Sequence, residues 1–148
     1  MTGSITYRTV PYGDRDFQQT IGLRDRVLRR PWGKTISADD TAIDRQALTM
    51  GAFDGERLIG MAMLMPTEDG VARLRFMAVE EAYRGRGVGR TLGERLAERA
   101  RERGDRTIVL YAREHAIPFY EKLGYRVTGT PFLPDHIEIV HVRMERTL

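Results

Sequence analysis

Three alternate glycines between a strand-like segment and a long helical pattern constrain this chain most strongly. The segment 74–79 has strand character, and Arg84-Gly85-Arg86-Gly87-Val88-Gly89 follows it and opens directly into helical periodicity. Glycine adopts left-handed backbone angles readily and places no side chain over neighbouring amides. The first N–H groups of a helix have no partner within the helix, and the dipole there is positive. The sequence therefore predicts a loop that binds an anion, most naturally a phosphate.

The spacing of these glycines excludes the two most common phosphate-binding loops. A dinucleotide-binding loop requires G-x-G-x-x-G, but its third glycine position falls on Arg90 or Leu92, depending on the starting glycine. A P-loop requires lysine and then serine or threonine after its last glycine, whereas Gly89 is followed by arginine. Taken alone, the glycines also fit a plain tight turn, so that alternative stays open.

The other segments alternate between strand and helix patterns and predict one α/β domain over residues 1–148. Alternating or continuous apolar runs predict strands over 5–10, 48–53, 58–65, 71–79, 107–111, 125–128 and 138–144. Apolar residues at helical spacing predict helices over 17–28, 88–103 and 116–123. Residues 34–44 fit either a loop or a short helix.

Composition excludes several classes of protein. The 148 residues are 41% hydrophobic, which suffices for one complete core, but no apolar run approaches the roughly 20 residues of a membrane helix. The absence of cysteine excludes disulfides, thiolate metal sites and a cysteine nucleophile. The first residues lack the apolar core of a signal peptide. We therefore expect a cytoplasmic protein with no metal cofactor and no membrane partner.

The charge pattern argues against a nucleic-acid partner. The formal net charge is only +3, because 24 basic residues are offset by 21 acidic ones. Nucleic-acid binding would require basic residues clustered together with aromatic ones. Here the two signs are interleaved, as in Glu94-Arg95 and Glu98-Arg99. Solvated helix faces explain most of these arginines.

Two motifs in this order resemble those of the GNAT acetyltransferase superfamily. The loop 84–89 resembles that family's R/Q-x-x-G-x-G/A loop, and Met77-Ala78-Val79 resembles the strand before it. Further along, the segment AIPFYEKLGY from Ala116 to Tyr125 resembles the second motif, A-x-x-F/L-Y-E-K-x-G-F/Y. The order of elements agrees along nearly the whole chain. The resemblance implies a GNAT-like fold, with a mixed, mostly antiparallel central sheet of six to seven strands flanked by helices.

The resemblance also implies acetyl-CoA as the donor and a primary amine, of a small molecule or a peptide, as the acceptor, in a monomer or a homodimer. Amides of residues 84–89 would hold the diphosphate, and the backbone of residues 77–79 would pair with the pantetheine arm where the family's strands part. The implied cofactor-binding residues are Met77, Ala78, Val79, Arg84, Gly85, Arg86, Gly87, Val88, Gly89, Arg90, Arg113, Ala116, Phe119 and Tyr120.

Two residues are candidates for catalysis. Tyr120 stands where the family often has its general acid, close to the sulfur, although a packed aromatic is the alternative. His141 alternates with two valines and resembles a histidine near the last strand of some small family members. Its ordinary pKa suits a base, although a structural role is the alternative. A backbone N–H near Ala78 or Val79 would stabilise the oxyanion. Tyr125 is interpreted as a core residue.

Two flanking positions are less clear. Arg113 departs from the family's usual Asn or Gln, and it either reaches the cofactor or faces water. His115 either caps the following helix or is simply exposed.

The sequence leaves the acceptor and part of the function open. The basic segment 23–32 would favour an acceptor with a carboxylate or phosphate, whereas Asp39, Asp40 and Asp44 would attract a cationic amine. The alternating methionines at 61, 63 and 65 fit either core packing or a wall against an apolar part of the acceptor. A noncatalytic acyl-CoA-binding or sensing domain, and a transferase that uses a longer acyl-CoA, remain alternatives.

Overall fold

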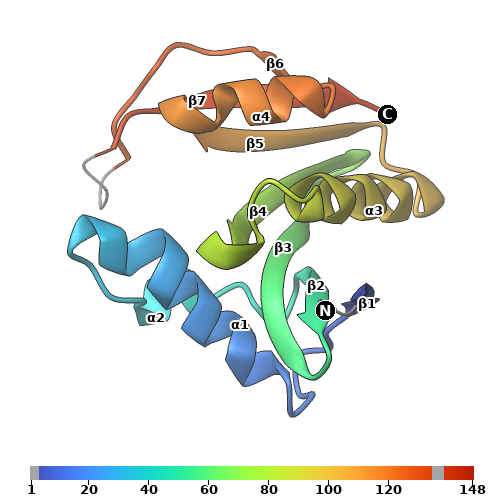
Figure 1. The fold of residues 1–148 in the computed structure, drawn as a ribbon. Helices are drawn as coiled ribbons and strands as arrows, with labels where there is room; N and C mark the ends of the chain where they lie inside the picture. Colours follow the sequence, from blue (N-terminus) through green and yellow to red (C-terminus); the bar gives the residue numbers. More distant parts are fainter. Residues whose placement is uncertain (1–3, 135–138) are drawn as a thin grey trace.

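A seven-stranded sheet in the order β1-β2-β3-β4-β5-β7-β6 organises the chain (Figure 1). The computed structural model describes residues 4–134 and 139–148. Every neighbouring pair of strands is antiparallel except β4 and β5, which are parallel. The predicted mixed, mostly antiparallel sheet is therefore confirmed. Its strands are β1 (Ile5–Thr9), β2 (Leu48–Asp54), β3 (Arg57–Glu68), β4 (Val71–Val79), β5 (Thr107–Arg113), β6 (Arg126–Val127) and β7 (His141–Thr147).

All seven predicted strands are present, with shifted ends. The last one was predicted from Glu138, which lies outside the described residues, and it ends three residues later than expected, at Thr147. The third strand continues from Met65 to Glu68 because it pairs with the start of β4 across the turn at Gly70.

The helices lie close to their predicted positions, with one change of type. The first, α1 (Phe17–Arg24), continues without a break as a π-helical turn, η1 (Asp25–Arg29), and a 3₁₀ turn, η2 (Arg30–Trp32). The undecided segment 34–44 contains a short helix, α2 (Ala38–Thr41), which Ser37 and Asp40 close with a capping box. The remaining helical elements are η3 (Glu81–Tyr83), α3 (Val88–Glu102), η4 (Glu114–Ala116) and α4 (Ile117–Lys122). Within the described ranges, no helix has the length and apolar character needed to cross a membrane.

The two faces of the sheet carry separate cores. On the α3 face, which α3 and α4 cover, Ala62 and Leu64 of β3 pack with Leu92 and Leu96. On the α1 face, which α1 covers, the alternate residues Met61 and Met63 of β3 pack with Phe17 and Leu23 of α1 instead. Both methionines are fully buried. The core interpretation is therefore correct for Met61 and Met63, whereas Met65 is only partly buried. The two buried methionines give no support for a longer acyl donor.

The parallel strands β4 and β5 separate after a short contact. They pair only where residues 71–73 face residues 107–109. Figure 1 shows the two strands meeting at one end and diverging toward the other. Residues 74–79 therefore have no strand partner on the edge that faces β5. This gap positions the candidate site.

A β-bulge in β4 accompanies the separation. Met61 pairs with Ala78 and Met63 pairs with Arg75, so two residues of β4 lie opposite one residue of β3. Phe76 is the surplus residue, and it has a φ of 55°, which is unusual for a residue other than glycine. Arg75 and Phe76 consequently both face the α1 side, whereas the residues on either side of them pack on the α3 face.

Candidate active site

The loop between β4 and α3 presents a run of unpaired main-chain donors. Gly85 and Gly87 have φ values of 78° and 79°, and Gly87 is the N-cap of the 15-residue helix α3. Before this run, Arg84 donates its amide to Glu81, and after it Thr91 donates to Gly87. Within the part of the chain that the structure describes, none of the amides of residues 85–90 donates to another protein group. The geometry thus has the free amides that an anion site at a helix N-terminus requires.

Open space surrounds this loop, and arginines flank it. A Cβ added at Gly85 or Gly87 would meet no atom within 4 Å. The Arg84 Nε donates to the Val79 carbonyl at 3.1 Å and so ties the loop to the end of β4. The Arg86 guanidinium lies 5.3 Å from the ring centre of Tyr83, and Arg90 is exposed. An anion can therefore approach the amides without displacing any side chain.

Gly89 and Phe119 hold the two helices of the α3 face together. A Cβ at Gly89 would lie 3.0 Å from the Phe119 ring, so a larger residue there would require the ring to shift by a few tenths of an ångström. Val88, next to it, is buried in the core of the α3 face. Val88 and Phe119, which were predicted to bind the cofactor, thus pack beneath the loop on the side of the core.

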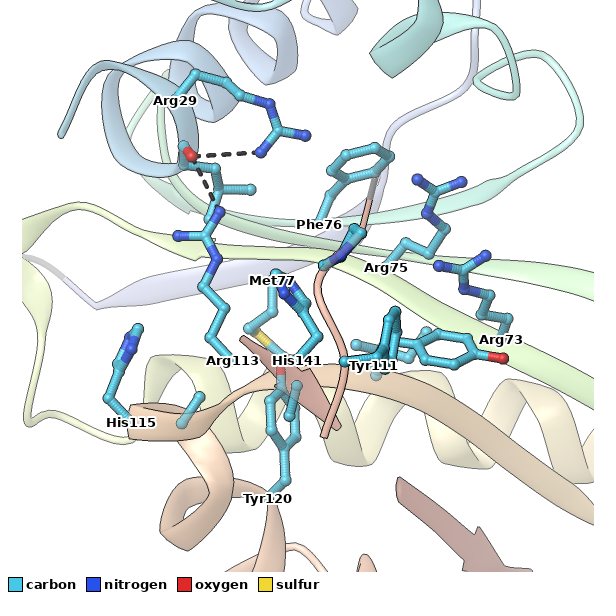
Figure 2. A pocket seen from close by; sticks show the side chains of 16 residues that line it. Arg29, Arg73, Arg75, Phe76, Met77, Tyr111, Arg113, His115, Tyr120 and His141 are labelled. Atoms are coloured by element: carbon cyan, nitrogen blue, oxygen red, sulfur yellow. Dashed lines mark hydrogen bonds between the residues drawn. The ribbon is translucent and has the colours of Figure 1, made fainter. Parts of the chain in front are cut away.

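A cavity of about 500 Å³ opens where β4 and β5 diverge. It brings together five residues predicted from the sequence, namely Met77, Arg113, Ala116, Tyr120 and His141 (Figure 2). The loop residues 84–90, together with Ala78, Val79 and Phe119, do not line it. Among the lining residues that sequence reasoning missed are Arg73, Arg75, Phe76 and Tyr111.

Tyr120 comes from α4 and is almost entirely buried, with 8% of its surface exposed. Its ring makes edge contacts with Phe119 and Tyr125, at centroid distances of 5.0 and 5.8 Å. Figure 2 shows its hydroxyl directed toward the middle of the cavity. Burial raises the pKa of the Tyr120 phenol, and the charge of Arg113 opposes this only in part. The phenol is therefore protonated at neutral pH and is able to donate a proton.

His141 begins β7 and pairs with Arg113 of β5. Its Nδ1 lies 2.7 Å from the carbonyl oxygen of Ile139, and because that oxygen can only accept, Nδ1 is the donor. The imidazole also packs near the ring of Phe132, with 6.3 Å between centroids. These contacts fix the ring at the cavity wall. Its role as a base stays a prediction.

Arg113 does not simply face water, and its predicted contact with the cofactor stays a prediction. It reaches across the gap and donates to the Leu28 carbonyl at 3.0 Å, and its guanidinium lies 5.6 Å from the ring centre of Trp32 (Figure 2). Burial, followed by the nearby charge of Arg29, lowers the pKa of Arg113. Arg113 thus joins the end of β5 to the helical segment on the α1 face. The neighbouring His115 is exposed and does not cap α4, so the capping hypothesis is wrong.

Two buried ion pairs neutralise charges of the first helical region. Arg24 and Arg29 pair with Asp44, in the turn after α2, and with Asp40 of α2, respectively. Arg24 and Asp44 form a two-point ion pair with N···O distances of 3.0 and 2.7 Å, and each side chain is only 1% exposed. Arg29 and Asp40 form a second, at 3.1 and 2.6 Å. Neither the acidic nor the basic side chains of these pairs are available to attract an acceptor.

The strand pairing distinguishes between the two main-chain amides that were predicted to donate to the oxyanion. The amide of Glu80 donates to Ile59 at 2.8 Å. Because donors alternate along an antiparallel ladder, the amide of Ala78 faces β3 and that of Val79 faces the gap. Of the two predicted donors, only Val79 therefore has the required direction.

Among residues 4–134 and 139–148, no three acidic or histidine side chains lie together as a metal site.

Comparisons with known proteins agree with this geometry. A family model described as "Acetyltransferase (GNAT) family" matches residues 15–125. The chain is 36% identical over 131 residues to "Uncharacterized N-acetyltransferase YjcF" of Bacillus subtilis (strain 168), covering 88% of this chain and 92% of that protein. Across four curated relatives that it matches, the chain spans from 52% to 92% of their length.

Solved structures show the same fold. A putative N-acetyltransferase from Lactobacillus plantarum superposes with a TM-score of 0.87 at 26% identity, covering 99% of both chains. An aminoglycoside 6'-N-acetyltransferase complexed with coenzyme A superposes with a TM-score of 0.77 at 19% identity, covering 96% of both chains. The second likeness concerns the fold alone.

Proposed function

Because the chain belongs to the GNAT acetyltransferase family, whose members use acetyl-CoA, we propose that it transfers the acetyl group of acetyl-CoA directly to a primary amine. The observation that carries the proposal is the run of free amides at residues 85–90, which follows the strand that borders the cavity.

The coenzyme would lie along the open edge of β4. Its diphosphate would bind the loop, and the amides of its pantetheine arm would pair with the backbone of residues 77–79, which has no strand partner on that side. This arrangement places the thioester in the gap beside Met77 and Tyr120. The chain has no cysteine, which supports direct transfer without an acyl-cysteine intermediate.

Each step of the transfer then has a candidate group. The neutral amine attacks the thioester carbon and forms a C–N bond, and the oxyanion that results accepts from the Val79 amide. Collapse of the intermediate breaks the C–S bond, and the Tyr120 phenol gives its proton to the departing thiolate. The surplus proton of the amine passes to a base, for which His141 is the candidate. Alignment of the two substrates alone supplies on the order of 7 kcal/mol in favourable cases.

We expect Tyr120→Phe to lower kcat roughly 100-fold, because a positioned general acid contributes about that much. The dissociation constant for acetyl-CoA should change less than about threefold, since the ring and its packing stay. Thiol release and calorimetry measure the two quantities. Tyr125→Phe is the matched control, because that hydroxyl is also buried, has no hydrogen-bond partner among the described residues, and lies outside the cavity. Equal kcat for Tyr120→Phe and the parent protein would remove the acid role.

The pH dependence provides an independent check. Burial raises the pKa of the Tyr120 phenol above its ordinary value, so the donor stays protonated throughout the neutral and mildly alkaline range. The ratio of kcat between the parent protein and Tyr120→Phe should therefore stay constant from about pH 6 to about pH 9. A ratio that falls toward 1 within this range would show that the phenol ionises there, contrary to the direction of the shift.

A screen of amines with thiol detection tests the whole proposal. Tight binding of acetyl-CoA without thiol release for any amine would favour the alternative, a noncatalytic acyl-CoA-binding or sensing domain.

A further inference from the structure

Two arginines of β4 project into the cavity without an ionic partner. Arg73 and Arg75 are both half-buried, and neither forms a salt bridge or a hydrogen bond with any described residue. Their recorded contacts are with aromatic rings: the Arg73 guanidinium lies 4.6 Å from the centre of the Tyr111 ring, and that of Arg75 lies 4.7 Å from the centre of the Phe76 ring. The Nε of Arg73 is buried and unsatisfied.

The surroundings of these arginines are basic. Arg113 also lines the cavity, as does Arg29, whose charge Asp40 offsets, and no carboxylate lines it among the residues that the structure describes. The nearby Asp40 is already held at two points by Arg29. Burial, followed by the charge of Arg73, lowers the pKa of Arg75 to about 10, while Asp40 opposes the shift. A buried guanidinium without a partner is costly, so these side chains are suited to receive an anion.

The anion in question is not the diphosphate of the coenzyme. Leu74 and Met77 of β4 pack on the α3 face, where the free amides of residues 85–90 begin α3. Arg73 and Arg75 alternate with Leu74 and therefore face the opposite, α1 side of the sheet. The two arginines and the free amides thus lie on opposite sides of the sheet, and each group can bind its own anion.

Building on the proposed function, we propose that Arg73 and Arg75 select an acceptor amine that carries a carboxylate or a phosphate group. The planar guanidinium matches both groups with paired hydrogen bonds. The rings of Tyr111 and Phe76 hold the two guanidinium groups in place through cation–π contacts.

Matched pairs of amines test this selection. Thiol release from acetyl-CoA is compared for O-phosphoethanolamine against ethanolamine, and for β-alanine against its amide. We expect the acidic member of at least one pair to have a kcat/KM at least about tenfold higher, and the preferred pair distinguishes phosphate from carboxylate. Equal or greater activity with the neutral members of both pairs would overturn the proposal.

Charge-removing variants locate the effect. Arg73→Gln and Arg75→Gln should each lower kcat/KM for the acidic amine roughly 10- to 100-fold and change that for its neutral partner less than about threefold. Arg99→Gln, on the exposed surface of α3, removes the same charge and should change neither. The dissociation constant for acetyl-CoA should stay constant in all three. A comparable loss of acetyl-CoA affinity in the β4 variants would assign these arginines to the coenzyme instead.

Binding is measured separately from transfer, so that the two proposals can fail independently. O-phosphoethanolamine and β-alanine are each added to the protein, and the melting temperature is recorded for the parent and Arg75→Gln. A rise in the parent that is lost in Arg75→Gln supports the anion site even if no amine is acetylated, in which case only the transferase assignment fails. No rise with either acidic amine in the parent overturns the anion site, even if neutral amines are acetylated.

Discussion

Gly87→Glu should raise the dissociation constant for acetyl-CoA at least about 100-fold, which corresponds to about 2.7 kcal/mol of binding free energy. Gly87 has a φ of 79° and is the N-cap of α3, and the space above it is open. A carboxylate there would stand over the free amides of residues 85–90 and repel the diphosphate that we propose for this loop. Each lost hydrogen bond between an amide and a charged oxygen costs about 1.5–3 kcal/mol. Calorimetric titration with acetyl-CoA measures the change.

The chain contains a matched control for this variant at the other end of α3. Gly104 also has a left-handed backbone, with a φ of 90°, and no atom lies within 4 Å of a Cβ added there. Gly104→Glu therefore introduces the same charge and the same backbone strain, about 1–2 kcal/mol, far from the loop. It should leave acetyl-CoA affinity unchanged. Equal affinity of both variants for acetyl-CoA would remove the loop from the binding site.

Asp44→Ala should lower the free energy of unfolding by about 3–5 kcal/mol, the usual cost of breaking a buried ion pair from one side. Asp44 and Arg24 are each 1% exposed, so the guanidinium left behind would be buried and unpaired. Arg24 also lies 4.9 Å from the ring centre of Phe76, so its displacement would loosen the bulge in β4. Unfolding in urea measures the loss.

Two further variants keep this stability prediction testable. Glu56→Ala removes a carboxylate that is 94% exposed and 4.0 Å from Arg15, and it should cost less than about 1 kcal/mol. If Asp44→Ala does not fold, the double variant Arg24→Met/Asp44→Leu should restore folding, because an apolar pair leaves no buried charge. Stability of Asp44→Ala within about 1 kcal/mol of the parent protein would contradict the assigned role of the pair.

The features that could be predicted from the sequence are local ones. The loop 84–89 and its position between a strand and a helix follow from glycine spacing and apolar periodicity within one short segment. Tyr120 could be placed because its neighbours along the chain form a recognisable motif. The capping box of α2 was also visible in principle, because Ser37 stands three residues before Asp40. The polar, acidic character of residues 34–44 left the choice between a loop and a short helix open.

The features that could not be predicted depend on pairing between distant segments. The patterns of β4 and β5 are ordinary strand patterns, and nothing in either shows that their pairing stops after Arg73. Arg24 lies in α1 and Asp44 in the turn after α2, so their ion pair has no local signal. The alternation of Arg73, Leu74 and Arg75 puts two arginines on one face of β4, but it gives no sign of what that face contacts. Only the divergence of the strands shows that this face lines a cavity.

Phe76 links the stability of the protein to its proposed activity. Its left-handed backbone costs on the order of 1–3 kcal/mol, and the surplus residue keeps β4 from forming a regular ladder with its neighbours. A sequence optimised only for thermal resistance would discard that strain, and with it the irregularity beside which the reactants are expected to meet. A substitution that relieves the strain at this position is therefore expected to raise the stability of the fold and to lower the proposed activity.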